Sequence, residues 1–456
     1  MSRVYIVTIL SLIFLSYLDG QEIVTWVKSG NGSWAVPGNW ETNAVPPVNR
    51  VPNVQDTVII EHDSVVIPAG FNAFARRVIL GVPGGSGTGL GVLANASLDI
   101  DDQWVSESTS NAGLHIQSAS FYNNGIVNIN DSEIGILVEE GTIDNLIEIN
   151  IQSCETGMSN NGTITNEVGA NLKITNISEL GVSNYGAIIN YGTITCLQMK
   201  DVFLNDQFGI ITDSLINEGL IDIQSINGTG FTDIAIIRNL GVIEMQNIKV
   251  GLSSTFQGSI IDNDGTWSMD EITDQGIIGS FEIVNDGTLL IEHFMGPGIM
   301  IGGTFTQNGL LILKHSLGTG PALWNDGDID NYGTIDIDST GSADVALIND
   351  NVLNNYFRLT INVAKDGFIN SGDFNNPGGV LSIEEGTGVG IHTELNFNNG
   401  SGGLVEINSF YRGILVEDLL KNQLGGTIET SNITDSPLEV LLGGTVENDG
   451  IMDFGL

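Results

Sequence analysis

One short motif recurs along this chain and constrains its fold more than any other feature. It reads Asn-x-Gly-x-φ-x-φ, where φ is an apolar residue. Consecutive copies begin at Asn217, Asn239, Asn263 and Asn285. A fixed period of this size indicates one supersecondary unit that is stacked many times. No such unit buries its apolar face alone, so neighbouring units must cover it.

The last apolar residue of each motif, here called the anchor, sets the register. From Ile223 onward, successive anchors are 22–24 residues apart. A second apolar residue stands two positions earlier, as in the pairs Val127/Ile129 and Ile147/Ile149, and this alternation is typical of a strand with one buried face. The anchors are Ile129, Ile149, Ile174, Cys196, Ile223, Met245, Met269, Ile291, Leu313, Ile337, Ile361, Ile383, Ile407, Thr430 and Phe454.

Polar and small residues occupy fixed places around each anchor. Gly stands four residues before the anchor in 12 of 15 units, and Asn stands six before it in 9 of 15, which predicts a turn at the same place in most units. Gly suits a positive φ or a close backbone approach. In coils stacked at the ~4.8 Å strand spacing, we expect the Asn amides to bond to one another in a ladder. A third apolar residue often follows three positions after the anchor, as at Ile177 and Ile226, and predicts a corner.

These patterns predict an all-β fold, a right-handed parallel β-helix of about 15 coils with 22–24 residues each. A series of β-hairpins is the alternative interpretation of a repeated Asn-Gly. Hairpins would place two strands between successive motifs at a shorter spacing, so the sequence favours the solenoid.

Differences in composition divide the chain into three segments. Residues 1–20 have one basic residue, Arg3, before the apolar run from Val4 to Leu15, which predicts a secretory signal peptide. Residues 21–118 are rich in Trp and Pro and predict a cap with the first irregular coils, since exposed sheet edges need protection. Residues 119–456 hold the regular repeats, and no later segment is long and apolar enough to predict membrane insertion.

The start of the second segment resembles a known group of proteins. The run Gly30-Asn31-Gly32-Ser33-Trp34 is followed by Asn39-Trp40, Pro46 and Asp56-Thr57-Val58-Ile59-Ile60. It is similar to the opening of large secreted repeat proteins of Bacteroidota and of β-helical, autotransporter-type adhesin passengers. The resemblance covers about 40 residues. It implies a bacterial, extracellular or cell-surface protein that is often adhesive. Such proteins commonly end in a sorting domain or a translocator barrel, whereas this chain ends on the anchor Phe454, so we expect a C-terminal continuation or an open last coil available for end-to-end association.

Composition limits the classes of partner and cofactor that the chain is expected to bind. The formal net charge of −41 would repel nucleic acid and anionic membrane surfaces. Acidic residues recur just before the anchors, and the plain interpretation is solubility. The run Glu406, Glu429 and Asp453 spans three successive coils, and stacked like charges favour a bridging cation, so these residues are the calcium candidate. No other cofactor is expected. Cys154 and Cys196 lie two coils apart, about 10 Å, which is too far for a disulfide.

One further cluster suits a transition metal. Glu271, His293 and His315 each lie two residues after an anchor in three consecutive coils, so stacking should align them on an outward corner. Carboxylate and imidazole groups are common zinc ligands. The alternative interpretation is that surface polar residues share a corner by chance.

The enzyme hypothesis has little support in the sequence. Parallel β-helices carry polysaccharide lyases and glycoside hydrolases, so the fold alone does not decide. Such a site needs clustered acids beside a base, and we expect no matching acid cluster for Arg238, Arg358 or Arg412. We therefore predict a secreted, non-catalytic surface or matrix protein, an adhesin or a spacer, with a carbohydrate-active enzyme as the alternative. Glycans or a host or neighbouring cell surface are the expected partners. Tyr332 and Tyr356 are candidates for an aromatic platform, with cross-coil packing as the plain interpretation.

Overall fold

The structure is a computed structural model, and it confirms the predicted parallel solenoid, with about 16 turns. It describes residues 22–83, 87–102, 112–204, 214–233, 235–255, 258–318, 320–338, 345–362 and 365–455. The predicted signal peptide therefore lies outside the described residues. In the described residues the regular elements are strands, apart from one 3-10 turn, Pro37–Asn39. No helix among these residues is long and apolar enough to cross a bilayer.

The chain divides into two compact units, Met1–Ile151 and Gln152–Leu456. In the first unit β1 pairs antiparallel with β3 and parallel with β4, after which the parallel register continues from β4 to β7 and from β7 to β10. Its strands are β1 (Ile23–Trp26), β2 (Gly32–Ser33), β3 (Trp40–Thr42), β4 (Thr57–Ile60), β5 (Ser64–Ile67), β6 (Asn72–Ala75), β7 (Arg77–Leu80), β8 (Thr88–Val92), β9 (Ser97–Asp101), β10 (Ala112–Ile116), β11 (Ala119–Asn123), β12 (Ile126–Asn130), β13 (Ile134–Val138), β14 (Gly141–Asn145) and β15 (Glu148–Gln152).

Three tryptophans pack together beside these first strands. Trp26, Trp34 and Trp40 are fully buried, and the Trp40 ring lies edge-on to the other two at centroid distances of 5.0 and 4.9 Å. The Trp40 indole N–H donates to the Trp34 carbonyl at 2.8 Å. Edge-to-face indole contacts add to the area that each ring buries. The Trp-rich segment is thus an apolar cluster of its own within the first unit.

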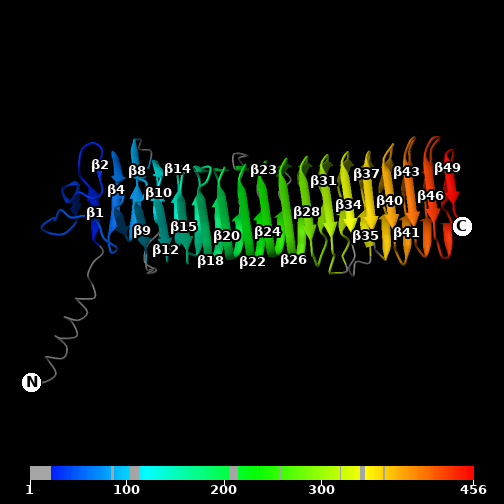
Figure 1. Cartoon of the computed structure of the whole chain (residues 1–456), viewed down its shortest axis with the longest axis horizontal. Coiled ribbons are helices and arrows are strands. Elements are labelled where there is room, and N and C mark those ends of the chain that lie inside the picture. Colours follow the sequence, from blue (N-terminus) through cyan, green and yellow to red (C-terminus); the bar gives the residue numbers. More distant parts are fainter. Residues whose placement is uncertain are drawn as a thin grey trace, which may run out of the picture. The chain divides into compact units, whose positions relative to one another are not determined.

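In the second unit each coil contributes strands to two sheets. The first strand of each coil follows the Asn-Gly corner. These strands are β18 (Asn171–Asn184), β20 (Thr193–Leu204), β22 (Leu220–Thr232), β24 (Val242–Ser254), β26 (Thr266–Gly279), β28 (Thr288–Glu292), β31 (Leu310–Lys314), β34 (Thr334–Asp338), β37 (Arg358–Asn362), β40 (Val380–Glu384), β43 (Leu404–Asn408), β46 (Thr427–Ser431) and β49 (Ile451–Phe454). Figure 1 shows the labelled members of this series side by side from green to red.

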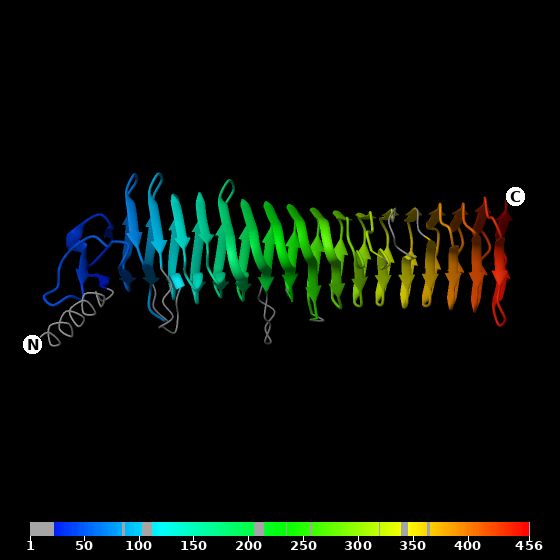
Figure 2. The ribbon, with the colours of Figure 1, turned by 90° about the horizontal axis from the view of Figure 1, so that it is seen from below.

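The second strand lies in the same sheet, and from β18 to β26 it is continuous with the first. Elsewhere it is separate, as β16 (Thr156–Asn160), β29 (Ile299–Ile301), β32 (Leu323–Asn325), β35 (Val345–Asn349), β38 (Asp366–Asn370), β41 (Val389–Thr393), β44 (Arg412–Val416) and β47 (Ser436–Val440). The long and the short strands can be followed in Figure 2.

The third strand of each coil forms the other sheet. Its members are β17 (Thr163–Asn166), β19 (Ala187–Asn190), β21 (Ser214–Asn217), β23 (Ile236–Asn239), β25 (Ile260–Asn263), β27 (Glu282–Asn285), β30 (Thr304–Gln307), β33 (Asp328–Asn331), β36 (Val352–Asn355), β39 (Asp373–Asn376), β42 (Asn396–Asn399), β45 (Leu419–Asn422) and β48 (Thr445–Asn448). Neighbours in this series pair in parallel, each with the next coil.

The predicted coil register is confirmed in the core. Ile243 pairs with Ile221 on one side and with Trp267 on the other, and Met245 pairs with Ile223 and Met269 in the same way. All of these side chains are at most 3% exposed. Residues that lie 22–24 positions apart in the chain are therefore direct neighbours, and each coil covers the apolar face of the next.

The turn after the anchor is also as predicted. The residue two positions past the anchor adopts a positive φ in coil after coil, including Asn176, Ser225 and Asn247 at 55–59°. This left-handed residue bends the strand, so the next apolar residue points back into the core. Ile177 and Ile226 are accordingly buried. Asn is among the few non-glycine residues that tolerate this conformation.

The Gly of the motif is required by close approach rather than by a positive φ. A Cβ at Gly241, Gly265 or Gly287 would collide with the backbone carbonyl of the equivalent Gly in the preceding coil. Coils stacked at the strand spacing leave no room for a side chain there. Because most corners have this constraint, the sequence repeats Gly at the same place in most coils.

The Asn of the motif forms the predicted ladder, which we call the inner Asn ladder. In the second unit its members are Asn166, Asn190, Asn217, Asn239, Asn263, Asn285, Gln307, Asn331, Asn355, Asn376, Asn399, Asn422 and Asn448. Each amide N–H donates to the side-chain oxygen in the next coil at 2.6–2.9 Å, except between Gln307 and Asn331. From Asn166 to Asn422 the members are at most 2% exposed, so these bonds satisfy groups that water does not reach.

The structure corrects the register of one coil in the first unit. The sequence predicts Ile147 and Ile149 as the inward pair, but Ile147 is 43% exposed and the buried residues are Ile149 and Ile151. The ladder bond between Asn123 and Asn145, at 2.8 Å, fixes this register. Ile147 occupies the place that Gly holds in most coils. The alternation of apolar residues therefore does not by itself show which two of them point into the core.

The two cysteines are both buried and form no disulfide, as their register predicts. Cys196 is an anchor in the core, where burial raises the pKa of its thiol. A thiol that stays protonated behaves as a small apolar residue.

Candidate functional site

The predicted metal-binding histidines do stack in space. Glu271, His293 and His315 occupy the positive-φ corner of consecutive coils, with φ values of 55°, 49° and 54°. The two imidazole rings lie nearly parallel, with centroids 5.1 Å apart. The His293 Nδ1 is 2.7 Å from the Asp270 carboxylate, an arrangement that orients many metal-ligating histidines.

Stacking alone does not bring these three ligands to one point. Among the described residues, Glu271, His293 and His315 do not each place a ligand atom within 4.8 Å of the other two. A zinc ion would need nitrogen and oxygen ligands at about 2.0–2.2 Å, so the side chains would have to rotate towards one another. The transition-metal hypothesis therefore stays a prediction.

The calcium candidate has the predicted alignment. Glu406 pairs with Glu429, and Glu429 pairs with Asp453, on strands β43, β46 and β49. Their carboxylates also do not converge within 4.8 Å in the described chain. A calcium ion takes six to eight oxygen ligands, so this row would need water to complete a site. The calcium hypothesis likewise stays a prediction.

A different acidic cluster does converge, and it was missed in the sequence. Asp262, Asp264 and Asp286 each place a carboxylate oxygen within 4.8 Å of the others. Burial raises the pKa of Asp262, and the charge of Asp264 raises it further. Arg238, on the neighbouring strand β23, is 3.5 Å from Asp262 and 3.8 Å from Asp264, and it partly offsets these effects.

The expectation of no matching acid cluster is therefore wrong for Arg238, and Arg412 also has acidic partners. Arg238 meets the cluster just described, and Arg412 lies 3.2 Å from Asp435 and 3.3 Å from Glu439. The spacings of 24 and 23 residues are the coil period, so the signal was present in the sequence. These pairs are a third or more exposed, so each contributes little stability.

The two predicted aromatic residues pack on each other. The rings of Tyr332 and Tyr356 are parallel within 4°, with centroids 4.6 Å apart. Tyr332 is 50% and Tyr356 39% exposed, and the adjacent Phe357 is 57% exposed. Burial raises the pKa of Tyr356, and the neighbouring Tyr332 and Asp330 raise it further. The two rings therefore pack on each other across neighbouring coils while both residues remain exposed.

Beside this pair lies a row of polar side chains that sequence reasoning also missed. We call it the outer amide column, and it consists of Asp330, Asn354, Asn375 and Asn398. These residues alternate with the buried positions of strands β33, β36, β39 and β42, so they point away from the core. In all four strands the column residue directly precedes a ladder Asn, and in three of them it is itself Asn, so an Asn-Asn pair marks the site in the sequence.

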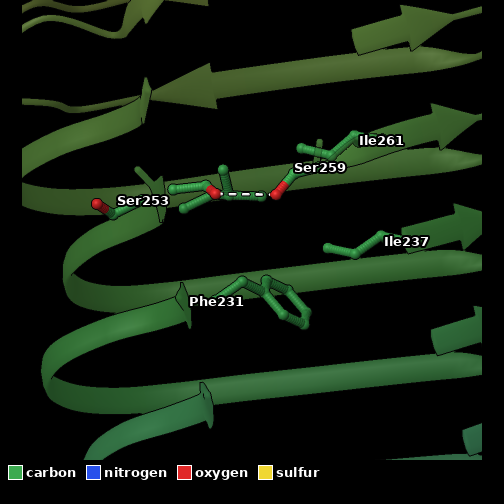
Figure 3. Close-up of a pocket in the computed structure, with 7 residues that line it drawn as sticks. Phe231, Ile237, Ser253, Ser259 and Ile261 are labelled. Carbon is green, nitrogen blue, oxygen red and sulfur yellow. Dashed lines mark hydrogen bonds between the residues drawn. The ribbon is translucent and has the colours of Figure 1, made fainter. Parts of the chain in front are cut away.

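A small cavity lies inside the second unit (Figure 3). It is lined by Phe231, Ile237, Leu252, Ser253, Ser254, Ser259 and Ile261 and has a volume of about 10 Å³. The Ser254 and Ser259 hydroxyls bond to each other across it at 2.9 Å, as the dashed line shows. Ligand pockets are usually about 300–1,000 Å³, so this cavity is too small for a sugar ring with its contacts.

Comparison with known proteins identifies no similar protein. No protein-family model, no curated protein and no solved structure matches the chain. Its chemistry must therefore be argued from its own residues.

Proposed function

We propose that this chain is a secreted, non-catalytic surface or extracellular matrix protein that acts as an adhesin or a spacer. The observation that carries the proposal is the unbroken coil register of the second unit, which repeats the same outward positions at each coil. Such a scaffold presents columns of side chains to a partner without the need for a cleft. The apolar run from Val4 to Leu15 supports export, and the net charge of −41 argues against nucleic acid as the partner.

The extracellular and bacterial part of this proposal rests on the sequence. The opening from Gly30 to Ile60 resembles that of secreted repeat proteins of Bacteroidota and of adhesin passengers. A solenoid that displays amide, carboxylate and aromatic columns fits such a role, because surface contacts with glycans use these groups. Glycans or a neighbouring cell surface are the partners that we propose.

Export is tested with the full chain carrying a C-terminal tag in a bacterial host. We expect the protein outside the cytoplasm, with a new N-terminus near Gln21 after removal of the signal segment. The variant Leu12→Arg, which places a charge in the apolar run, should remain inside the cell. A wild-type chain that stays in the cytoplasm with Met1 intact would overturn the proposal.

One observation favours the alternative, a carbohydrate-active enzyme. Asp262 has a raised pKa beside two further carboxylates and Arg238, which is a combination used in acid–base catalysis. Reducing-sugar release from neutral and acidic polysaccharides tests this alternative. We expect no release above the level of Asp262→Asn. Release that this substitution abolishes would establish the enzyme instead.

A further inference from the structure

The outer amide column is held together by bonds between coils. The Asn354 amide N–H donates to Asp330 at 2.8 Å, and the Asn375 amide donates to Asn354 at 2.9 Å. The Asn398 amide reaches Asn375 at 3.4 Å and accepts from Gln423 at 2.9 Å. Side chains that would otherwise be mobile are thereby held in a fixed orientation.

The column retains half of its hydrogen-bonding capacity. A carboxamide has two N–H donors and two acceptor lone pairs. Asn354 and Asn375 each use one N–H towards the preceding coil and one acceptor position towards the next. Both side chains are only half-buried, so the remaining donor and acceptor face solvent. Each coil therefore offers one donor and one acceptor at a step of ~4.8 Å.

Aromatic side chains border this column. Tyr332 and Tyr356 follow the ladder residues at the ends of β33 and β36, the same strands that carry Asp330 and Asn354. Asp330 pairs with Asn354 on the neighbouring strand, and the Tyr332 and Tyr356 rings that follow on these two strands stack with centroids 4.6 Å apart. Phe357, the next residue after Tyr356, is also exposed. Donor–acceptor groups beside exposed aromatic carbon suit a ligand with both hydroxyl groups and C–H surfaces.

The surrounding charge decides which hydroxyl-rich ligand fits. Asp328 and Asp373 lie on the same face as the column, and Asp350 and Glu394 lie at its corner. An anionic polymer would be repelled by these carboxylates. A neutral polymer would not, and its hydroxyls can both donate to and accept from the amides.

We propose that the outer amide column binds a neutral polysaccharide that lies along the solenoid axis. Successive sugar rings, each on the order of one ~4.8 Å coil step in length, would place their hydroxyls against Asn354, Asn375 and Asn398. Tyr356 and Phe357 would contact the C–H edge of the sugar. This inference rests on the proposed adhesin function and names the ligand class of that function.

The test uses the full exported chain and three probes in affinity electrophoresis: soluble β-glucan, mannan and polygalacturonate. We expect retardation by at least one of the neutral polymers and none by polygalacturonate. The double variant Asn354→Ala/Asn375→Ala should weaken binding by about tenfold or more, because it removes two donor–acceptor pairs. The control Asn362→Ala changes an outward Asn on β37, in the other sheet, and should bind within about twofold of wild type.

Each other outcome overturns the inference. Retardation that the double variant does not change, or that occurs only with polygalacturonate, would exclude the column as the neutral-glycan site. Self-association in sedimentation experiments that the double variant abolishes would assign the column to a second copy of this chain. No retardation by β-glucan or mannan, with normal export, overturns this inference but leaves the surface role intact, whereas failed export overturns that role. Circular dichroism of the double variant verifies that the solenoid is folded.

Discussion

The inner Asn ladder and the outer amide column run through the same coils and use the same bond between neighbouring amides. In the ladder Asn331 donates to Asn355 at 2.8 Å, and in the column Asn375 donates to Asn354 at 2.9 Å. The direction differs, since ladder amides donate to the following coil and column amides to the preceding one. The two sets of amides differ more in the partner of their second N–H. In the ladder it donates to a backbone carbonyl, as from Asn331 to Arg358 at 2.9 Å.

This comparison teaches that the bond itself does not decide what an amide does. A buried amide is costly unless both its N–H groups have partners, so the ladder must be complete and is structural. A half-buried amide can leave one donor and one acceptor bonded to water, and a ligand can replace that water. Substitutions in the ladder should therefore change stability more than substitutions in the column.

Removal of one ladder amide should give the largest loss of stability. Asn355→Ala leaves the Asn331 N–H and the Asn376 Oδ1 without their partner, and it frees the Val380 carbonyl. Orphaned buried groups cost about 1–3 kcal/mol each, so we expect a loss of about 3 kcal/mol. The measurement is the urea unfolding midpoint by circular dichroism. Its control is Asn354→Ala, one residue earlier on the outward face, and an equal loss there would contradict the comparison.

The natural interruption of the ladder should be repairable. Gln307 donates to the Thr334 carbonyl at 3.3 Å, and the buried Asn331 Oδ1 has no hydrogen-bond partner among the residues that the structure describes. Gln307→Asn should restore the missing bond and stabilise the protein by about 1 kcal/mol. The reciprocal change Asn285→Gln should destabilise it by a similar amount. Thermal melting of both variants checks the prediction, and a fall in midpoint for Gln307→Asn would refute it.

An outward carboxyl should make stability depend on pH in a defined direction. Burial raises the pKa of Asp336, and the charge of Asp338 raises it further. The folded state therefore binds the proton more tightly than the unfolded state, so this carboxyl destabilises the fold above its folded pKa. The effect is relieved as pH falls through that value towards the usual carboxyl pKa of 3.8. Asp336→Asn should stabilise the protein at pH 7 by at most about 1 kcal/mol and not at pH 3. Urea titrations at both pH values test this, and an equal gain at both would contradict it.

The smallest effect on stability should come from the column itself. Asn375→Ala removes one acceptor for Asn398 and one donor to Asn354, but water can replace both. We expect a change within about 0.5 kcal/mol in the unfolding midpoint. A loss comparable with that of Asn355→Ala would show that the column is structural and not a binding surface.

Most of the fold could be predicted because a solenoid turns sequence spacing into contact. The pairing of Ile221, Ile243 and Trp267, the corner at Asn247 and the Asn ladder all follow from one repeat length. The prediction was wrong at Ile147, where a bulky residue stands in the place of Gly, because alternation has two registers and only the ladder bond of Asn145 selects one.

The candidate sites were harder to predict because outward residues carry no apolar signal. The cluster of Asp262, Asp264 and Asp286 with Arg238 obeys the coil spacing, yet so do many other acid combinations in a chain with 55 acidic residues. The directions of the side chains determine which of these acid combinations converge. For the same reason, Glu271, His293 and His315 are aligned without converging.

The coil period, the buried strand face, the Gly and Asn corners and the separation of the two cysteines follow directly from the amino-acid sequence. These properties depend on repeat length and on the size and polarity of each residue, which are local quantities. Only the tertiary structure decided which outward groups meet, which amides are sealed from water and which still face it. Burial and side-chain orientation arise from the stacked coils together, so no single repeat contains them.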